Sequence, residues 1–99
     1  MKAVLIGDPK IQKKAYTSLR LRWPDATVQV AHKTSEGVEL VRKIFPDIVL
    51  LCGTFLPETI QALRRRNTMP VLGLNHQHKD DEGEVVTALD AGADGYVRL

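Results

Sequence analysis

The chain has a single cysteine, few aromatic residues and no long apolar run. Because Cys52 is the only cysteine among 99 residues, a monomer cannot form a disulfide, which favours a reducing cytoplasm. The apolar runs are far shorter than the roughly 18 residues of a membrane span. The apolar part of the amino terminus, MKAVLIGD, is also too short for a secretory signal. We therefore expect a cytoplasmic protein without a membrane partner.

An excess of charge is also lacking. The net charge is +2 and the pI is about 8.9, which do not indicate a nucleic-acid partner unless the cations gather on one face. Three arginines adjoin at 64–66, but no aromatic residues that could stack on bases are interleaved with them. Cations are also favoured at the end of a helix. We expect no direct nucleic-acid binding by this domain.

Short apolar runs alternate with helical patterns along the chain, without a repeat or a linker. Strands are predicted at 2–6, 26–31, 47–52, 71–74 and 95–99. Helices are predicted at 9–22, 34–45, 56–66 and 81–90. This alternation is typical of βαβ units. It predicts one α/β domain over 1–99, a three-layer, doubly wound fold with a parallel five-stranded sheet.

Two helix starts carry recognisable capping patterns. Asp8 precedes Pro9, so Asp8 is expected to cap the first helix. The run Thr34-Ser35-Glu36 is expected to cap the second helix. The apolar face of that second helix is predicted from residues at helical spacing, which are Val38, Val41, Ile44 and Phe45.

Ligands of such sheets bind outside the carboxyl ends of the strands, so functional groups are expected there. The positions concerned are Gly7, Asp8, Cys52, Gly53, Asn75, His76 and Leu99.

The stretches GDPKIQKK, PDIVLLCGTFLP and DDEGEVVTALDAGADGYVRL resemble the receiver domain of bacterial two-component response regulators. The resemblance covers essentially the whole chain and implies the flavodoxin-like strand order 2-1-3-4-5. It further implies a phosphoacceptor aspartate after the third strand and two acids after the first that hold Mg²⁺. It also implies a Thr or Ser after the fourth strand, and an aromatic residue and a Lys in or after the fifth.

Most of these groups are replaced in this chain. Cys52 stands at the phosphoacceptor position, and Gly7 and Asp8 stand at the positions of the acidic pair. Asn75, Tyr96 and Leu99 stand at the positions of the Thr or Ser, the aromatic residue and the Lys, which we call the switch positions. Mg²⁺ prefers oxygen ligands, and phosphoryl transfer depends on positioning and charge stabilisation. We therefore predict a non-enzymatic pseudo-receiver without metal or cofactor. Its expected role is phosphorylation-independent protein interaction and dimerisation in bacterial signal transduction or transcription regulation.

The family's fifth helix has no counterpart in the sequence, so the domain is expected to be truncated relative to the family. The third helix is also expected to be short. Without the fifth helix, a stripe of the first, third, fourth and fifth strands is predicted to face water, and such patches usually mark interfaces. Either the chain is part of a longer protein or a second subunit covers this face. The other expected interface is Glu84–Asp90 with Gly95–Leu99.

Other interpretations of the strand-end residues stay open. The pocket around Asp8 and Cys52 could sense a small ligand or redox state, with the thiol pKa lowered by Lys10, His76 or a helix amino terminus. Cys52 could instead be a small buried hydrophobe. Asp8, Cys52, His76 and His78 could hold Zn²⁺, against two solvated histidines. Asp47 is rejected as an acceptor because it precedes its strand.

Overall fold

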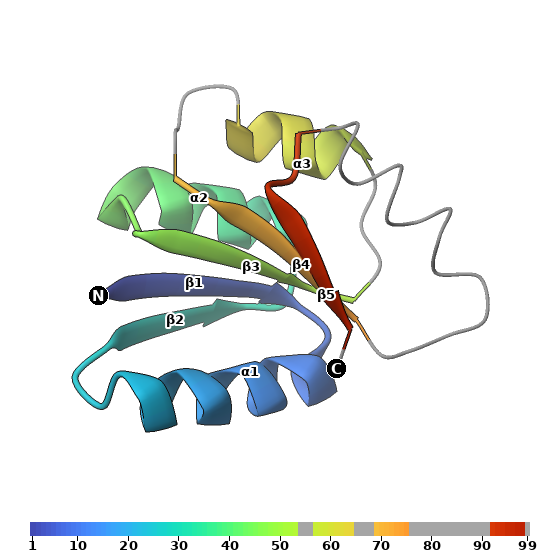
Figure 1. Ribbon diagram of the computed structural model, residues 1–99. Helices are drawn as coiled ribbons and strands as arrows, with labels where there is room; N and C mark the ends of the chain where they lie inside the picture. Colours follow the sequence, from blue (N-terminus) through green and yellow to red (C-terminus); the bar gives the residue numbers. More distant parts are fainter. Residues whose placement is uncertain (54–56, 65–68, 76–91, 99) are drawn as a thin grey trace.

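The computed structural model describes residues 1–53, 57–64, 69–75 and 92–98 (Figure 1). Its strands are β1 (Lys2–Gly7), β2 (Thr27–Ala31), β3 (Ile48–Cys52), β4 (Val71–Asn75) and β5 (Gly95–Arg98). Its helices are α1 (Pro9–Arg22), α2 (Thr34–Ile44) and α3 (Pro57–Arg64). The predicted helix at 81–90 lies outside the described residues. None of the described helices is both long enough and apolar enough to cross a bilayer.

The five strands form one parallel sheet in the order β2-β1-β3-β4-β5, which confirms the predicted α/β topology. Helix α1 covers one face of the sheet, and α2 and α3 lie on the other (Figure 1). The arrangement therefore has three layers. The strands run in the same direction, so the ends of β1, β3 and β4 meet at one edge.

Alternating strand residues divide the core into two clusters, one on each face of the sheet. The cluster on the α1 face consists of Ala3, Leu5, Ile11, Ala15, Leu19, Leu50, Cys52 and Leu74. The cluster beneath α2 and α3 consists of Val4, Ile6, Val41, Val49, Leu51, Ile60, Leu63, Val71 and Ala93. Gly37 lets α2 approach β1 closely, because a Cβ at this position would overlap the Ile6 side chain.

The predicted water-facing stripe is smaller than expected among the described strand side chains on the α1 face. Leu5 is fully buried, and Leu50 and Leu74 are each only 6% exposed. Ile48 and Leu72 are partly buried against the same cluster. The apolar side of α1 packs over β1 and β3, and an apolar hollow lined by Leu19, Trp23, Leu50 and Leu74 lies beside the helix.

The ends of α2 differ from the prediction. Its N-cap is Lys33, which makes no side-chain capping hydrogen bond, so capping from Thr34-Ser35-Glu36 is wrong. Phe45 follows the last helical residue with φ 49°, and its side chain is 75% exposed. The left-handed turn carries this ring away from the core, so placing Phe45 on the buried face is also wrong. Val41 is buried as expected.

Candidate functional site

The carboxyl ends of β1, β3 and β4 form the edge at which functional groups were expected. Gly7 pairs with Cys52 across β1 and β3, and Cys52 pairs with Leu74 across β3 and β4. Beyond the strands, the Asp8 amide donates a 2.8 Å hydrogen bond to the Cys52 carbonyl. The Gly53 amide donates one of 2.7 Å to the Leu74 carbonyl. The structure therefore brings Gly7, Asp8, Cys52 and Gly53 together, as predicted.

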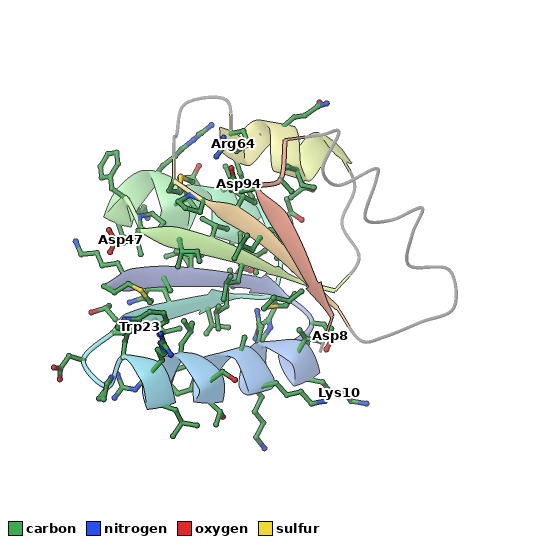
Figure 2. The ribbon with its side chains drawn as sticks, viewed as in Figure 1. Asp8, Lys10, Trp23, Asp47, Arg64 and Asp94 are labelled. Carbon is green, nitrogen blue, oxygen red and sulfur yellow. The ribbon has the colours of Figure 1, made fainter. Side chains whose placement is uncertain are left out.

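Asp8 lies at this edge, at the start of α1 (Figure 2). Its backbone is extended, with φ −65° and ψ 122°, and its Oδ1 accepts a 2.8 Å hydrogen bond from the Lys10 amide. The Asp8 side chain is exposed. The predicted N-cap is thus confirmed. One carboxylate oxygen is engaged in holding the first helical turn, and this competes with any role as a metal ligand.

Cys52 is buried at the end of β3, with 1% of its surface exposed. Its Sγ lies 3.8 Å from the Leu50 carbonyl oxygen. Burial, together with the smaller effect of the nearby negative charge of Asp8, raises the pKa of the thiol from 9.0 to about 12. The thiol is therefore protonated at neutral pH and is a poor nucleophile. The idea that Lys10 or a helix amino terminus lowers this pKa is wrong in direction.

Two glycines at the edge have backbone conformations that disfavour any other residue. Gly7 has φ +121° and Gly53 has φ +109°. A Cβ at Gly53 would lie 3.5 Å from the Asp8 Cβ, which is ordinary contact, so space is not the obstacle there. At Gly7 the conformation itself opposes an acidic side chain. The first position matched to the family's acidic pair thus holds a glycine in a conformation that residues with a Cβ rarely adopt.

The described donors do not fit a magnesium ion. Among the residues that the structure describes, no group of three or more His, Cys, Asp or Glu side chains could hold a metal. At the strand ends Asp8 offers one carboxylate, which already caps α1, and Cys52 offers a protonated thiol. Mg²⁺ requires several oxygen ligands. His76 and His78 of the zinc alternative lie outside the described residues.

The remaining predicted positions are described only in part. Asn75 pairs with Arg98, and Gly73 pairs with Tyr96, so the Asn75 backbone reaches the strand-end edge. Leu99, and the side chains of Asn75 and Tyr96, lie outside the described part of the chain. The switch assignment stays a prediction.

Asp47 lies at the opposite edge of the sheet from Asp8 (Figure 2). Its Oδ2 accepts a 2.8 Å hydrogen bond from the Lys2 amide, and its own amide donates one of 2.8 Å to the Lys2 carbonyl. This placement agrees with its rejection as a phosphoacceptor.

Gln12 is a supporting residue that the sequence analysis missed. It is 4% exposed, and its Nε2 donates to the carbonyls of Leu5 at 3.3 Å and Ala31 at 2.7 Å. It thereby joins the ends of β1 and β2 beside the site. The available signal was its spacing, because Gln12 precedes Ala15 by three residues and Leu19 by seven on the buried side of α1.

Comparison with known proteins gives curated sequence relatives and solved structures of similar fold. No protein-family model matches the chain. The chain is 32% identical over 102 residues to the nitrate/nitrite response regulator protein NarL of Escherichia coli K12. That match covers 95% of this chain and 45% of the relative. The chain thus spans about half the length of the curated relatives it matches.

Two solved structures illustrate the similarity of fold. One is a LuxR-family two-component response regulator from Aurantimonas sp. SI85-9A1, with 25% identity and a TM-score of 0.74 over 98% of this chain and 72% of that one. The other is an atypical orphan response regulator described as having a phosphorylation-independent regulatory mechanism. It has 18% identity and a TM-score of 0.79, over 99% of this chain and 81% of that one, and shows the fold alone.

Proposed function

We propose that the chain is a receiver domain of the type found in bacterial two-component response regulators, and that it acts without phosphorylation, as a cytoplasmic protein-interaction and dimerisation module. In this proposal it regulates signal transduction or transcription by presenting a surface to a protein partner or to a second copy. It has no catalytic role. The phosphorylation-independent mechanism stated for the atypical orphan regulator is a precedent on the same fold.

The observation that carries the proposal is the state of Cys52. It stands where the family resemblance implies an aspartate, and it is a buried thiol with a pKa of about 12. Asp8 is the only acidic residue at the two matched positions, and its carboxylate caps α1. An acceptor oxygen and a divalent-cation site are thus both missing from the described residues, and phosphoryl transfer depends on both.

The same observation argues against the redox alternative. A sensor thiol reacts as the thiolate and needs access to its oxidant. Cys52 has neither property in this conformation, since it is protonated and 1% exposed. The proposed interaction surfaces remain Glu84–Asp90 with Gly95–Leu99, and the sheet face beside α1.

The test is exposure of the purified chain to acetyl phosphate and Mg²⁺, followed by intact-mass measurement. We expect no added phosphate, with E. coli NarL treated in parallel as the positive control. Sedimentation at micromolar concentration, with and without the phosphodonor, should give the same dimeric state. Stoichiometric phosphate on this chain, or a monomer that dimerises only with the donor, would overturn the proposal.

A further inference from the structure

Helix α1 concentrates positive charge that the chain as a whole does not have. Its sequence, PKIQKKAYTSLRLR, contains five of the fourteen Lys and Arg residues and no acidic residue. The five cations are Lys10, Lys13, Lys14, Arg20 and Arg22, and all are exposed. The small net charge of the chain, +2, therefore does not reflect the strongly positive charge of this helix.

The charges on α1 are not neutralised within the described structure. The two ion pairs found among the described residues, Arg42–Glu39 and Arg64–Asp94, are both away from α1. Arg20 donates a 2.8 Å hydrogen bond to the Ala26 carbonyl, and Arg22 lies over the Trp23 ring at 5.8 Å. Neither contact removes the positive charge. The helix thus presents a field that attracts an anionic surface.

Exposed apolar side chains accompany these cations. Leu21 is 80% exposed, and it lies four residues after Thr17 and seven after Lys14, on the outward side of α1. Tyr16 and Trp23 are 43% and 46% exposed. We define the α1 cationic face as Lys10, Lys13, Lys14, Thr17, Arg20 and Leu21. Leu21 is a large apolar group placed between cations and left in water.

We propose that the α1 cationic face docks an acidic segment of a partner protein that also carries an apolar residue. This inference rests on the proposed protein-interaction function and names the chemistry of the partner. Complementary charge steers association, so the positive charge of α1 requires a negatively charged partner surface. Leu21 supplies the apolar anchor that charged rims surround in protein interfaces.

The same residues favour a protein over other polyanions. Phosphate groups gain nothing from Leu21, and Arg22 already lies over the Trp23 ring, which leaves that ring a poor stacking platform for bases. An anionic bilayer requires a broad apolar face on the helix. The outward side of α1 offers only Leu21 between lysines and arginine. An acidic helix or loop with one apolar side chain uses both features.

The experiment uses the full chain and a synthetic acidic helical peptide built from Glu and Leu, with binding measured calorimetrically at low and high salt. We expect binding that weakens with salt. Reversal of three cations, in Lys10→Glu/Lys13→Glu/Lys14→Glu, should weaken it by at least about 100-fold, and Leu21→Ser by roughly tenfold. The matched control Lys2→Glu/Lys33→Glu/Lys43→Glu changes the net charge equally, and should alter binding by no more than about twofold. Circular dichroism and the unfolding midpoint establish that each variant is folded.

Four results would overturn the inference. The first two are equal peptide binding by the folded triple variant and equal binding of a peptide with Gln in place of Glu. The others are tighter binding of duplex DNA or phosphatidylserine vesicles at the same salt, and the absence of any peptide binding at low salt. Each leaves the phosphodonor and sedimentation results untouched, so failure of this surface is distinguishable from failure of the proposed function.

Discussion

Arg64 of α3 and Asp94, which precedes β5, form an ion pair of 3.0 Å between Nη1 and Oδ2 across 30 positions of sequence (Figure 2). The same Asp94 oxygen accepts a 2.8 Å hydrogen bond from the Val71 amide. Arg64 Nη1 also donates to the Met69 carbonyl at 2.8 Å. These contacts join the end of α3, the start of β4 and the approach to β5.

Asp94→Ala should destabilise the chain more than Arg64→Ala. Loss of Asp94 leaves the part-buried Val71 amide without its side-chain acceptor and should lower the free energy of unfolding by about 1–3 kcal/mol. Loss of Arg64 removes a partly solvated ion pair, which contributes up to about 1 kcal/mol, and a hydrogen bond to the carbonyl of Met69, a residue that is only partly buried. Urea denaturation measures both. The control is Glu39→Ala, which breaks the exposed 3.5 Å pair with Arg42. Equal losses for Asp94→Ala and Glu39→Ala would contradict the prediction.

Cys52 should make stability fall in alkaline solution. The thiol pKa is about 12 in the folded chain and 9.0 when unperturbed. Between these values the unfolded chain has lost the proton and the folded chain keeps it. Stability is therefore fully present below about pH 9 and declines toward pH 12, by up to about 1.4 kcal/mol per pH unit.

Urea denaturation between about pH 8 and about pH 11 measures this decline. Cys52→Ala is the control, because it cancels the contributions of the lysines and tyrosines that titrate in the same range. The difference in unfolding free energy between wild type and variant should shrink as pH rises. A constant difference would show that the Cys52 pKa is not raised.

Asp8 has two roles that substitutions can separate. Asp8→Asn keeps an oxygen for the Lys10 amide and removes the charge, so the helix should keep its cap while the pKa of Cys52 falls below about 12. Burial, the larger cause, should still hold that pKa above 9.0. Asp8→Ala should lower stability by about 1 kcal/mol through loss of the cap. Thiolate absorbance against pH and urea denaturation report the two effects. An unchanged Cys52 pKa in Asp8→Asn would count against the charge effect.

Replacing Gly7 should be costly whatever the new side chain. Its φ of +121° is strained for residues with a Cβ, so Gly7→Ala and Gly7→Asp should each lower the unfolding free energy by about 1–3 kcal/mol. Thermal unfolding measures the stability of both variants. Gly7→Ala reports the backbone effect alone, whereas Gly7→Asp adds charge repulsion with Asp8. Wild-type stability in Gly7→Asp would mean that the turn accommodates an acid freely.

The layout of the sheet was predictable from sequence because it depends on local patterns repeated along the chain. Each apolar run is separated from the next by a helical pattern, and parallel strands with right-handed crossovers leave few possible orders. The capping role of Asp8 was predictable for the same reason, since a cap acts within three residues.

Features that depend on distant partners or on single backbone angles were not predictable. Arg64 was interpreted as a helix-end cation, whereas it contacts an aspartate 30 positions away. Phe45 fits the helical spacing of its neighbours, but one left-handed residue turns it outward. Gln12 was unremarkable among lysines until β1 and β2 placed two carbonyls beside it. The burial of Cys52 was one of two open interpretations, and packing against the α1 cluster decides for it.

The turn at Gly7 opposes an acidic residue at the first position matched to the family's acidic pair. An exchange of side chains at positions 7 and 52 would put one carboxylate on an unsuitable main chain and another in an apolar interior. Rebuilding an aspartyl-phosphate switch on this scaffold therefore means re-routing the connection between β1 and α1. An engineer should begin with that connection and treat the choice of acids as the second step.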